Sequence, residues 1–215
     1  MTPVSIYAHL CKCNAASGCD EFDGHVLACI FAVAAMEAGP GRSLVDALGI
    51  SGKVLRRCAE QYFPGAQGMF ESFAFEGEPV VDEDEKCVRE LLRRSRTSGG
   101  AISSLLVILI ARRSTRPNHL WQDLGLQNRN ELSRLMMRHF APLAKRNDQD
   151  MKWKKFFYRM ICRDEGFALC SAPSCSECCD FGNCFGDESG ESLLARTRYQ
   201  IETQGLISIA AVCSQ

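Results

Sequence analysis

Apolar residues recur at spacings of three and four along most of the chain, whereas long alternations of β-branched and polar residues are missing. Spacings of three and four place apolar side chains on one face of a helix, and alternation is typical of strands. The pattern therefore predicts an all-α fold. The expected helices are 24–38, 51–63, 82–96, 101–113, 128–139 and 150–162.

Polar and turn-forming residues mark two helix boundaries. Asp23 is expected to cap the first helix, and the glycine-proline-glycine run at 39–41 to end it. Asn128 and Glu131 have the spacing of a capping box, in which each side chain bonds the backbone N–H of the other residue.

The two longest apolar runs, residues 25–36 and 101–111, are shorter than the roughly 20 residues needed to cross a bilayer. They predict buried helices, and no contact with a membrane is expected.

Two parts of the chain share a pattern of leucine, glycine and phenylalanine. Each is expected to form a short helix, a turn at glycine and a longer helix, because glycine tolerates the positive φ that such a turn often needs. The pattern predicts two helix-turn-helix-like halves. A cysteine-rich metal-binding loop is expected to follow them. The matching residues are Leu44, Leu48, Gly49, Ile50, Leu55, Phe63 and Pro64 in the first copy and Leu120, Leu124, Gly125, Leu126, Leu132, Phe140 and Pro142 in the second.

The chain is expected to divide into four parts. These are a flexible cysteine-containing leader (1–22), an N-terminal helical half (23–78), a C-terminal helical half that includes a cysteine cluster (79–188) and a C-terminal tail (189–215). The leader is expected to be flexible because its small and polar residues give no sign of a packed scaffold.

Composition and charge indicate the cellular compartment and the kind of chemistry that the cysteines perform. The 25 Lys and Arg residues against 26 Asp and Glu give a formal net charge of −1, so no overall positive field attracts nucleic acid or anionic lipid. The first residues lack the pattern of a secretory signal, and we therefore expect a cytoplasmic protein. In that reducing compartment 13 cysteines indicate metal or redox chemistry rather than a disulfide framework.

The strongest chemical signal is the spacing Cys170-x4-Cys175-x2-Cys178-x5-Cys184. Thiolates are the soft ligands that iron-sulfur clusters take, and intervening proline and glycine let a loop aim several sulfurs at one centre. Cys179, next to Cys178, permits a second register, and spacing alone does not choose between the neighbours. The cluster is expected to hold an iron-sulfur centre.

Three other kinds of chemistry compete for these cysteines. A zinc site is disfavoured because zinc ribbons usually carry two well-separated Cys-x2-Cys pairs, and only one occurs here. A plant-type ferredoxin has its fourth ligand far downstream in a mostly β fold. Free redox thiols, or a sulfur- or electron-transferring enzyme, would use the vicinal pair Cys178-Cys179, but no Ser/His/Asp set or nucleotide fingerprint accompanies it.

A basic helix precedes the cysteines. Lys152, Lys155 and Arg159 lie along one side of the expected helix 150–162, and an oxyanion that approaches thiolates needs local positive charge. A solvated basic face over an aromatic one is the alternative. Arg138 and His139 are further candidates for contacting the oxyanion, although a lone histidine is more often structural.

A helix-turn-helix unit can also read DNA, so a metal-sensing transcriptional regulator, with iron-sulfur or zinc as its sensor, is the alternative function. The second helices mix arginine with glutamate and apolar residues instead of presenting a basic face. This composition favours a scaffold role for both units, and binding of nucleic acid is not expected.

The sequence resembles the NifQ family, closely over about residues 119–188 and less closely back to about Asp23. The residues that carry the resemblance are HLWQDLGL (119–126), ELSRLMMRHFAPLA (131–144), Asn147-Asp148, DMKWKKFFYR (150–159) and the four spaced cysteines ending in Cys184-Phe185-Gly186.

The resemblance implies a role in nitrogen fixation. NifQ proteins donate molybdenum for assembly of the iron-molybdenum cofactor of nitrogenase and carry an iron-sulfur centre that can include molybdenum. The expected partners are the cofactor-assembly proteins, namely the scaffold complex and the Fe protein, together with molybdate or another molybdenum source; no enzymatic activity is expected. The family's metal-binding motif transfers to Cys170, Cys175, Cys178 and Cys184 without a change in spacing.

Cys11, Cys13 and Cys19, flanked by His9 and His25, are not part of the family pattern and receive no role from the resemblance. Two interpretations stay open. They form a second metal site, or they are thiols of the leader, which is the favoured one.

Overall fold

The computed structural model describes residues 2–14, 17–38, 43–70, 73, 77–164, 188 and 194. Within these ranges it contains eleven helices and no strand, which confirms the all-α prediction. None of the described helices is both long and apolar enough to cross a membrane. The helices are α1 (Pro3–Asn14), α2 (Glu21–Glu37), α3 (Leu44–Leu48), α4 (Gly52–Tyr62), α5 (Gln67–Phe70), α6 (Glu83–Arg94), α7 (Ala101–Ser114), α8 (Leu120–Asp123), α9 (Arg129–His139), α10 (Ala141–Ala144) and α11 (Trp153–Asp164).

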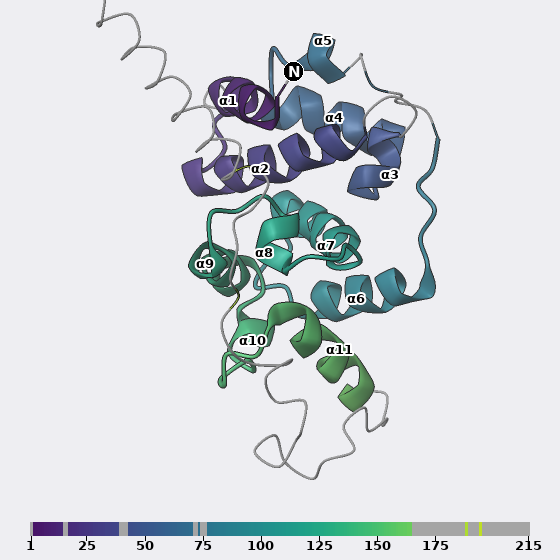
Figure 1. Cartoon of the computed structure of the whole chain (residues 1–215), viewed down its shortest axis with the longest axis vertical. Coiled ribbons are helices and arrows are strands. Elements are labelled where there is room, and N and C mark those ends of the chain that lie inside the picture. The colour runs from purple at the N-terminus through teal and green to yellow at the C-terminus, as the bar shows by residue number, and fades with distance from the viewer. Residues whose placement is uncertain are drawn as a thin grey trace, which may run out of the picture.

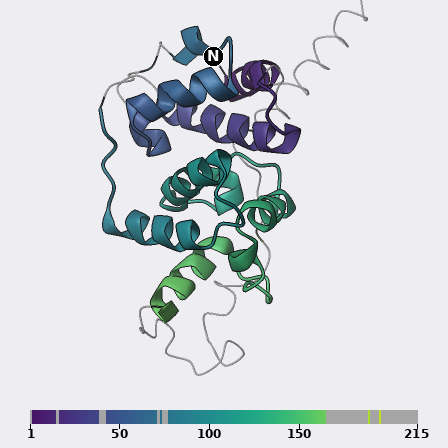
Figure 2. The same ribbon diagram turned by 180° about the vertical axis from the view of Figure 1, so that it is seen from behind.

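The helices lie in three layers (Figures 1 and 2). Helices α1 to α5 form one outer layer, α7 to α9 the middle layer, and α6, α10 and α11 the other outer layer. Helix α3 packs against α7, and α6 packs against both α7 and α11. Buried apolar residues from all three layers belong to one hydrophobic cluster. The division of the chain at residue 78 stays a prediction.

Helix α2 is buried over almost its whole length, as expected for a helix that is apolar on all sides. It begins three residues earlier than predicted, because Asp20 and not Asp23 is the cap. The Asp20 carboxylate accepts hydrogen bonds from the backbone N–H groups of Phe22 and Asp23, at 3.0 and 3.2 Å. Asp23 is buried in the first turn, and the predicted stop at 39–41 lies outside the described residues.

The expectation of a flexible leader is wrong for residues 3–14, which form helix α1. Ile6 and Leu10 are buried, and α1 packs along α2. The reason is their spacing of four, which places both side chains on the face of α1 that meets α2. This apolar stripe is short and is flanked by polar residues, so the sequence interpretation overlooked it.

The two helix-turn-helix-like units form as predicted. Gly49 links α3 to α4 and Gly125 links α8 to α9, with φ of 69° and 74°. Both longer helices have 11 residues and end at a phenylalanine, Phe63 (φ −135°, ψ 56°) or Phe140 (φ −137°, ψ 41°). The repeated pattern in the sequence therefore corresponds to a repeated backbone conformation.

Gly125 is required for its size as well as for its φ. A Cβ atom at this position would lie 2.6 Å from Cγ2 of Val33 and 3.0 Å from the carbonyl oxygen of Cys29. The turn between α8 and α9 thus touches the backbone of α2, which fixes the second unit against the core.

The predicted capping box at α9 forms only in part. The Asn128 side chain accepts from the N–H of Glu131 at 3.0 Å. The Glu131 carboxylate accepts instead from the N–H of Gln127 at 2.8 Å, and its other oxygen binds His25 of α2 at 2.7 Å. The Glu131 carboxylate thus bonds Gln127 and His25 in place of the backbone N–H of Asn128 that a capping box requires.

Candidate functional site

The predicted metal ligands Cys170, Cys175, Cys178 and Cys184, together with Cys179, lie outside the described residues. The structure does describe a residue on either side of this cysteine segment, which we define as residues 165–187. Asp164 precedes it at the end of α11, and Glu188 follows it. Both are held to the helical body by arginines.

Asp164 is shared between two arginines from different elements. Its carboxylate pairs with Arg94 of α6 and, at 3.4 Å, with Arg146, which follows α10. The chain therefore enters the cysteine segment from a point that is tied to two other parts of the lower layer.

Glu188 is anchored more deeply. One carboxylate oxygen lies 2.7 Å from Arg129 at the start of α9 and 3.6 Å from Nδ1 of His119 before α8, and the side chain is only 4% exposed. Its other oxygen is buried and accepts no hydrogen bond from the described part of the chain. A buried carboxylate needs such charged partners, because burial disfavours an isolated charge. Glu188, which follows the cysteine segment, is thus held beside the start of α9 and the residue that precedes α8.

Arg129 also holds the turn that leads into α11. Its guanidinium donates to the backbone oxygens of Asp150 and Met151, at 2.8 and 3.0 Å, and pairs with the Asp150 carboxylate at 2.9 Å. Asn147 closes the same turn, because its side chain bonds both the N–H and the C=O of Met151 at 2.9 Å. One side chain, that of Arg129, therefore joins this turn to Glu188.

The turn carries the one non-glycine residue with positive φ in the described part of the chain, Asp150 at 53°. Residues held in this conformation cost free energy and persist where the surroundings fix them. Here the surroundings are the hydrogen bonds from Arg129 and Asn147.

A pocket of about 200 Å³ lies between this turn and α11. We call it the arginine pocket, because three arginines and only one acidic residue line it. Its floor includes the buried side chains of Met151, Phe156 and Met160. The polar lining residues are Arg146, Asn147, Asp148, Gln149, Arg159 and Arg163.

Of the three predicted basic residues only Arg159 lines this pocket. Lys152 lies just before α11 and is half-buried, and Lys155 is exposed. Arg146 and Arg163 were missed. Arg163 could have been found from its spacing of four after Arg159, whereas Arg146 comes from another element and only the fold brings it here.

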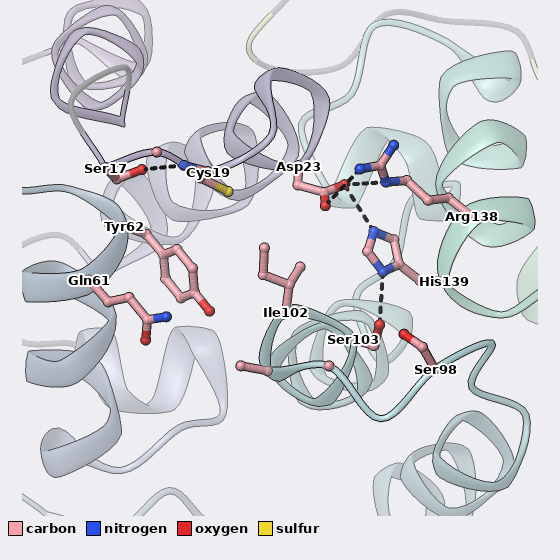
Figure 3. A pocket seen from close by; sticks show the side chains of 13 residues that line it. Ser17, Cys19, Asp23, Gln61, Tyr62, Ser98, Ile102, Ser103, Arg138 and His139 are labelled. Carbon is pink, nitrogen blue, oxygen red and sulfur yellow. Dashed lines mark hydrogen bonds and ion pairs between the residues drawn. The ribbon is translucent and has the colours of Figure 1, made fainter.

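A second cavity, of about 520 Å³, opens between α2, α4, α7 and α9 (Figure 3). His139 lies at its edge with both ring nitrogens engaged: Nε2 lies 2.9 Å from the Asp23 carboxylate and Nδ1 lies 3.0 Å from the Ser103 hydroxyl. Arg138 pairs with Asp20 at 3.1 Å and with Asp23 at 2.9 Å. These contacts favour a structural role for His139 and Arg138 over the oxyanion contact considered for them.

Ser103, His139 and Asp23 have the order of a Ser/His/Asp set, which the sequence interpretation did not find. The three residues come from α7, α9 and α2 and are far apart in the chain. All three side chains are buried. The set therefore acts as a polar link between three helices, because each buried polar group finds its partner there.

The N-terminal cysteines do not gather at a centre. Cys13 lies 3.8 Å from His9 on α1, and Cys19 lines the second cavity. Burial raises the pKa of the Cys19 thiol, and the nearby Asp23 carboxylate adds to that rise, so the thiol stays protonated near neutral pH. Among the described residues, no three His, Cys, Asp or Glu side chains are grouped so that they could hold a metal ion.

His25 instead takes part in a buried network. Tyr7 bonds its Nδ1 at 2.8 Å, and Glu131 bonds its Nε2 at 2.7 Å. Burial opposes a charge on the ring, but hydrogen bonds with two cysteines and with Glu131 outweigh it and raise the pKa of His25 above its ordinary value. The network joins α1 and α2 to α9.

Comparison with known proteins identifies relatives over most of the chain. The model of the NifQ family matches residues 26–186. The protein NifQ homolog of Sinorhizobium fredii is 41% identical over 177 residues, which covers 80% of this chain and 75% of that protein. Protein NifQ of Rhodobacter capsulatus is 36% identical over 146 residues, which covers 67% of this chain and 79% of the relative.

A shorter match has higher identity. Protein NifQ of Klebsiella pneumoniae is 49% identical over 78 residues, which covers 36% of this chain and 47% of that protein. No solved structure matches the chain. The family match spans well over half of the residues, including the arginine pocket and the four spaced cysteines, and the chain therefore belongs to the NifQ family.

Proposed function

We propose that this protein is a non-catalytic molybdenum carrier of the cytoplasm. It takes up molybdenum as an oxyanion, holds it at an iron-sulfur cluster bound by Cys170, Cys175, Cys178 and Cys184, and donates it to the proteins that assemble the nitrogenase iron-molybdenum cofactor. Those partners are the scaffold complex and the Fe protein. Membership of the NifQ family supports the general role, in nitrogen fixation and in molybdenum handling.

The donor set suits an iron-sulfur cluster. Four thiolates within residues 170–184 are soft ligands in a compact arrangement, which is the chemistry such a cluster requires. When bound, the cluster supplies sulfides to which molybdenum can bind. The protein's own part is to hold the thiolates, keep the segment in place and bring the oxyanion near it.

One observation supports the proposal most directly. Both ends of the cysteine segment are tied to the body by ion pairs, at Asp164 and at Glu188, and Arg146 and Arg129 in these pairs also touch the arginine pocket or the turn that forms its wall. A carrier needs its cargo site and its anion entry close together, and the anchoring of both ends of the cysteine segment supports such an arrangement.

The same contacts weaken the alternative of a DNA-reading regulator. In a helix-turn-helix protein the second helix must offer its basic side chains to the major groove. In α9, Arg129 binds Glu188, Arg138 binds Asp23, and Arg134 lies over the Phe22 ring at 4.0 Å. The arginines of this helix are thus engaged within the protein.

Anaerobic reconstitution with iron, sulfide and molybdate tests the proposal. Elemental analysis and EPR spectroscopy of the wild-type protein are expected to detect iron together with molybdenum. Cys175→Ser should lose most of both metals, whereas Cys13→Ser, which changes a thiol of α1, should retain them. Zinc without iron in the wild-type protein, or molybdenum that stays bound after all four cysteines are replaced, would contradict the proposal.

A further inference from the structure

We propose that the second cavity (Figure 3) binds the carboxylate of a small, singly charged organic acid. The first backbone N–H groups of α7 and the hydroxyl of Tyr62 hold the carboxylate, and the rest of the acid fills the remaining space. Such a site is independent of the proposed carrier function, because none of its residues belongs to the cysteine segment or to the arginine pocket.

The start of α7 lacks a side-chain cap. The first N–H groups of any helix have no acceptor within the helix, and together they carry about half a positive charge. Side chains accept from these groups at α2, α4, α6 and α9, but the cap of α7 is Gly100, which has no side chain to do so. Gly100, Ala101, Ile102 and Ser103 line the cavity, so the start of the helix borders it. Helix starts of this kind bind anions.

Tyr62 provides the second, independent feature. Its side chain extends from the end of α4 into the cavity, toward the start of α7 (Figure 3). The residue is only 5% exposed, yet within the described part of the chain its hydroxyl has no hydrogen-bond partner. Buried polar groups are normally hydrogen-bonded, so this hydroxyl points to a partner inside the cavity.

The hydroxyl of Tyr62 is a hydrogen-bond donor at neutral pH. Burial raises the pKa of Tyr62 above its ordinary value, so the group stays protonated. An O–H group and several N–H groups match the oxygens of an ionised carboxylate, which only accept hydrogen bonds. Such bonds are stronger than those between neutral groups, and this favours a carboxylate over a carbonyl or hydroxyl oxygen.

The charges around the cavity limit its ligand to a single negative charge. Arg138, the one arginine among the described lining residues, pairs with Asp20 at 3.1 Å and with Asp23 at 2.9 Å. His139 also lies 2.9 Å from the buried Asp23 carboxylate, whereas Asp20 is 47% exposed and its charge is screened by water. Because two carboxylates share one guanidinium, the remaining negative charge opposes a dianion such as sulfate.

The size and the lining of the cavity suit a short organic acid. Its volume of about 520 Å³ lies within the range of about 300–1,000 Å³ that is typical of sites for small molecules. The ring of Tyr62 and the side chain of Ile102 offer apolar contacts, and Ser17, Gln61 and Ser98 offer hydroxyl and amide groups. An acid of a few carbon atoms, with or without a hydroxyl group, matches this lining.

NMR titration of the full-length, ¹⁵N-labelled protein at constant ionic strength tests the site. Butyrate is the probe, and butyramide and succinate are its neutral and doubly charged counterparts. Butyrate should shift the amide signals of Ile102 and Ser103, and it should bind at least about tenfold more tightly than either counterpart. The reason is that butyramide lacks the charged acceptor, while the second charge of succinate is repelled.

Tyr62→Phe removes the hydroxyl and keeps the ring. Butyrate should bind this variant at least about tenfold more weakly, because one charged hydrogen bond is lost. Thermal stability should not fall, since the hydroxyl has no partner among the described residues. Tyr158→Phe removes a hydroxyl from α11, outside the cavity, and should change the affinity less than about twofold.

Gly100→Asp supplies a carboxylate from the protein itself. Gly100 has φ −60° and ψ 155°, which aspartate adopts readily, and an added Cβ meets only the Ser98 hydroxyl, at 3.7 Å. The new side chain should accept from the N–H groups of Ile102 and Ser103, so stability should not fall while butyrate affinity falls at least about tenfold. Gly99→Asp, where an added Cβ meets nothing within 4 Å, places the same charge one residue earlier and should weaken binding less than about threefold.

Equal affinity for butyrate and butyramide, or wild-type affinity in Tyr62→Phe and Gly100→Asp, would overturn the site. So would the absence of butyrate-induced shifts at Ile102 and Ser103. N-acetyl-alanyl-alanine carries its carboxylate at the end of a peptide and should bind no more tightly than butyrate; tighter binding would overturn a free acid as the occupant. Reconstituted Tyr62→Phe should hold as much iron and molybdenum as the wild type, and a loss of metal would contradict the independence of the two sites.

Discussion

The guanidinium of Arg129 lies 2.7 Å from the carboxylate of Glu188 and fastens the end of the cysteine segment to the start of α9. Glu188 is nearly inaccessible to water, so this pair is a buried anchor and differs from a surface ion pair such as that between Glu90 and Arg93. The two kinds of pair should respond differently to removal of one charge.

Glu188→Gln is expected to lower the free energy of unfolding by about 1.5–3 kcal/mol, because the buried guanidinium loses a charged hydrogen bond. Chemical denaturation of the metal-free protein measures this change. Iron transfer from the loaded variant to a chelator should be faster than in the wild type. Glu90→Gln removes an exposed charge and should leave both measurements nearly unchanged; equal effects of the two substitutions would speak against an anchor at Glu188.

Gly125→Ala is expected to destabilise the protein by at least about 1 kcal/mol, since alanine is strained at φ 74° and its Cβ would meet Val33 and the backbone of Cys29. Thermal unfolding followed by circular dichroism provides the measurement. Gly68→Ala is the matched control, because an added Cβ there meets nothing within 4 Å. A stable Gly125→Ala protein would mean that α2 and the second turn are not in close contact.

His139→Gln is expected to reduce stability by about 1–3 kcal/mol, because the buried Asp23 carboxylate and the Ser103 hydroxyl lose a shared partner. The amounts of iron and molybdenum bound per folded protein should not change. Elemental analysis after reconstitution, alongside denaturation, distinguishes this structural role from metal ligation, for which metal content would fall in proportion to the lost ligand.

The pair His25–Glu131 predicts a pH dependence of stability. The pKa of His25 is raised above its unfolded value of 6.5, so its contribution is complete below about pH 6.5 and declines as pH rises toward the folded pKa. Burial opposes the charge of Glu131, but the hydrogen bond from His25 outweighs it and lowers the pKa of Glu131 below 4.5; its contribution is complete above that pH and declines in acid.

Stability should therefore decrease as the pH rises above about 6.5, and His25→Gln should flatten this slope. Denaturant titrations at several pH values measure it. His9→Gln, at an exposed position of α1, is the control and should keep the wild-type slope. A wild-type slope in His25→Gln would show that other groups cause the dependence.

Much of the fold could be predicted because it depends on local patterns. Apolar spacing located α2, α4, α6, α7, α9 and α11, and the glycine pattern located both turns. The cap of α2 was misplaced because Asp20 and Asp23 are chemically equivalent candidates, and only packing makes one of them buried.

Fewer residues of the candidate site could be predicted from the sequence, because the contacts of the site join residues far apart in the chain. Arg159 was identified from helical spacing, but Arg146 comes from the preceding turn. Glu85 illustrates the same limit: it lies in the acidic run 82–85, yet it is buried and pairs with Arg89 and Arg112. No periodicity distinguishes a buried carboxylate from an exposed one.

The two copies of the repeated unit share their backbone conformation but differ in the residue that begins the longer helix. In both copies an 11-residue helix follows its cap directly, and its first residue is Gly52 in one copy and Arg129 in the other. The first copy thus folds with no side chain at this position. The guanidinium in the second copy is dispensable for the architecture of the unit, and it distinguishes a plain structural module from one that also holds the end of the cysteine segment through Glu188.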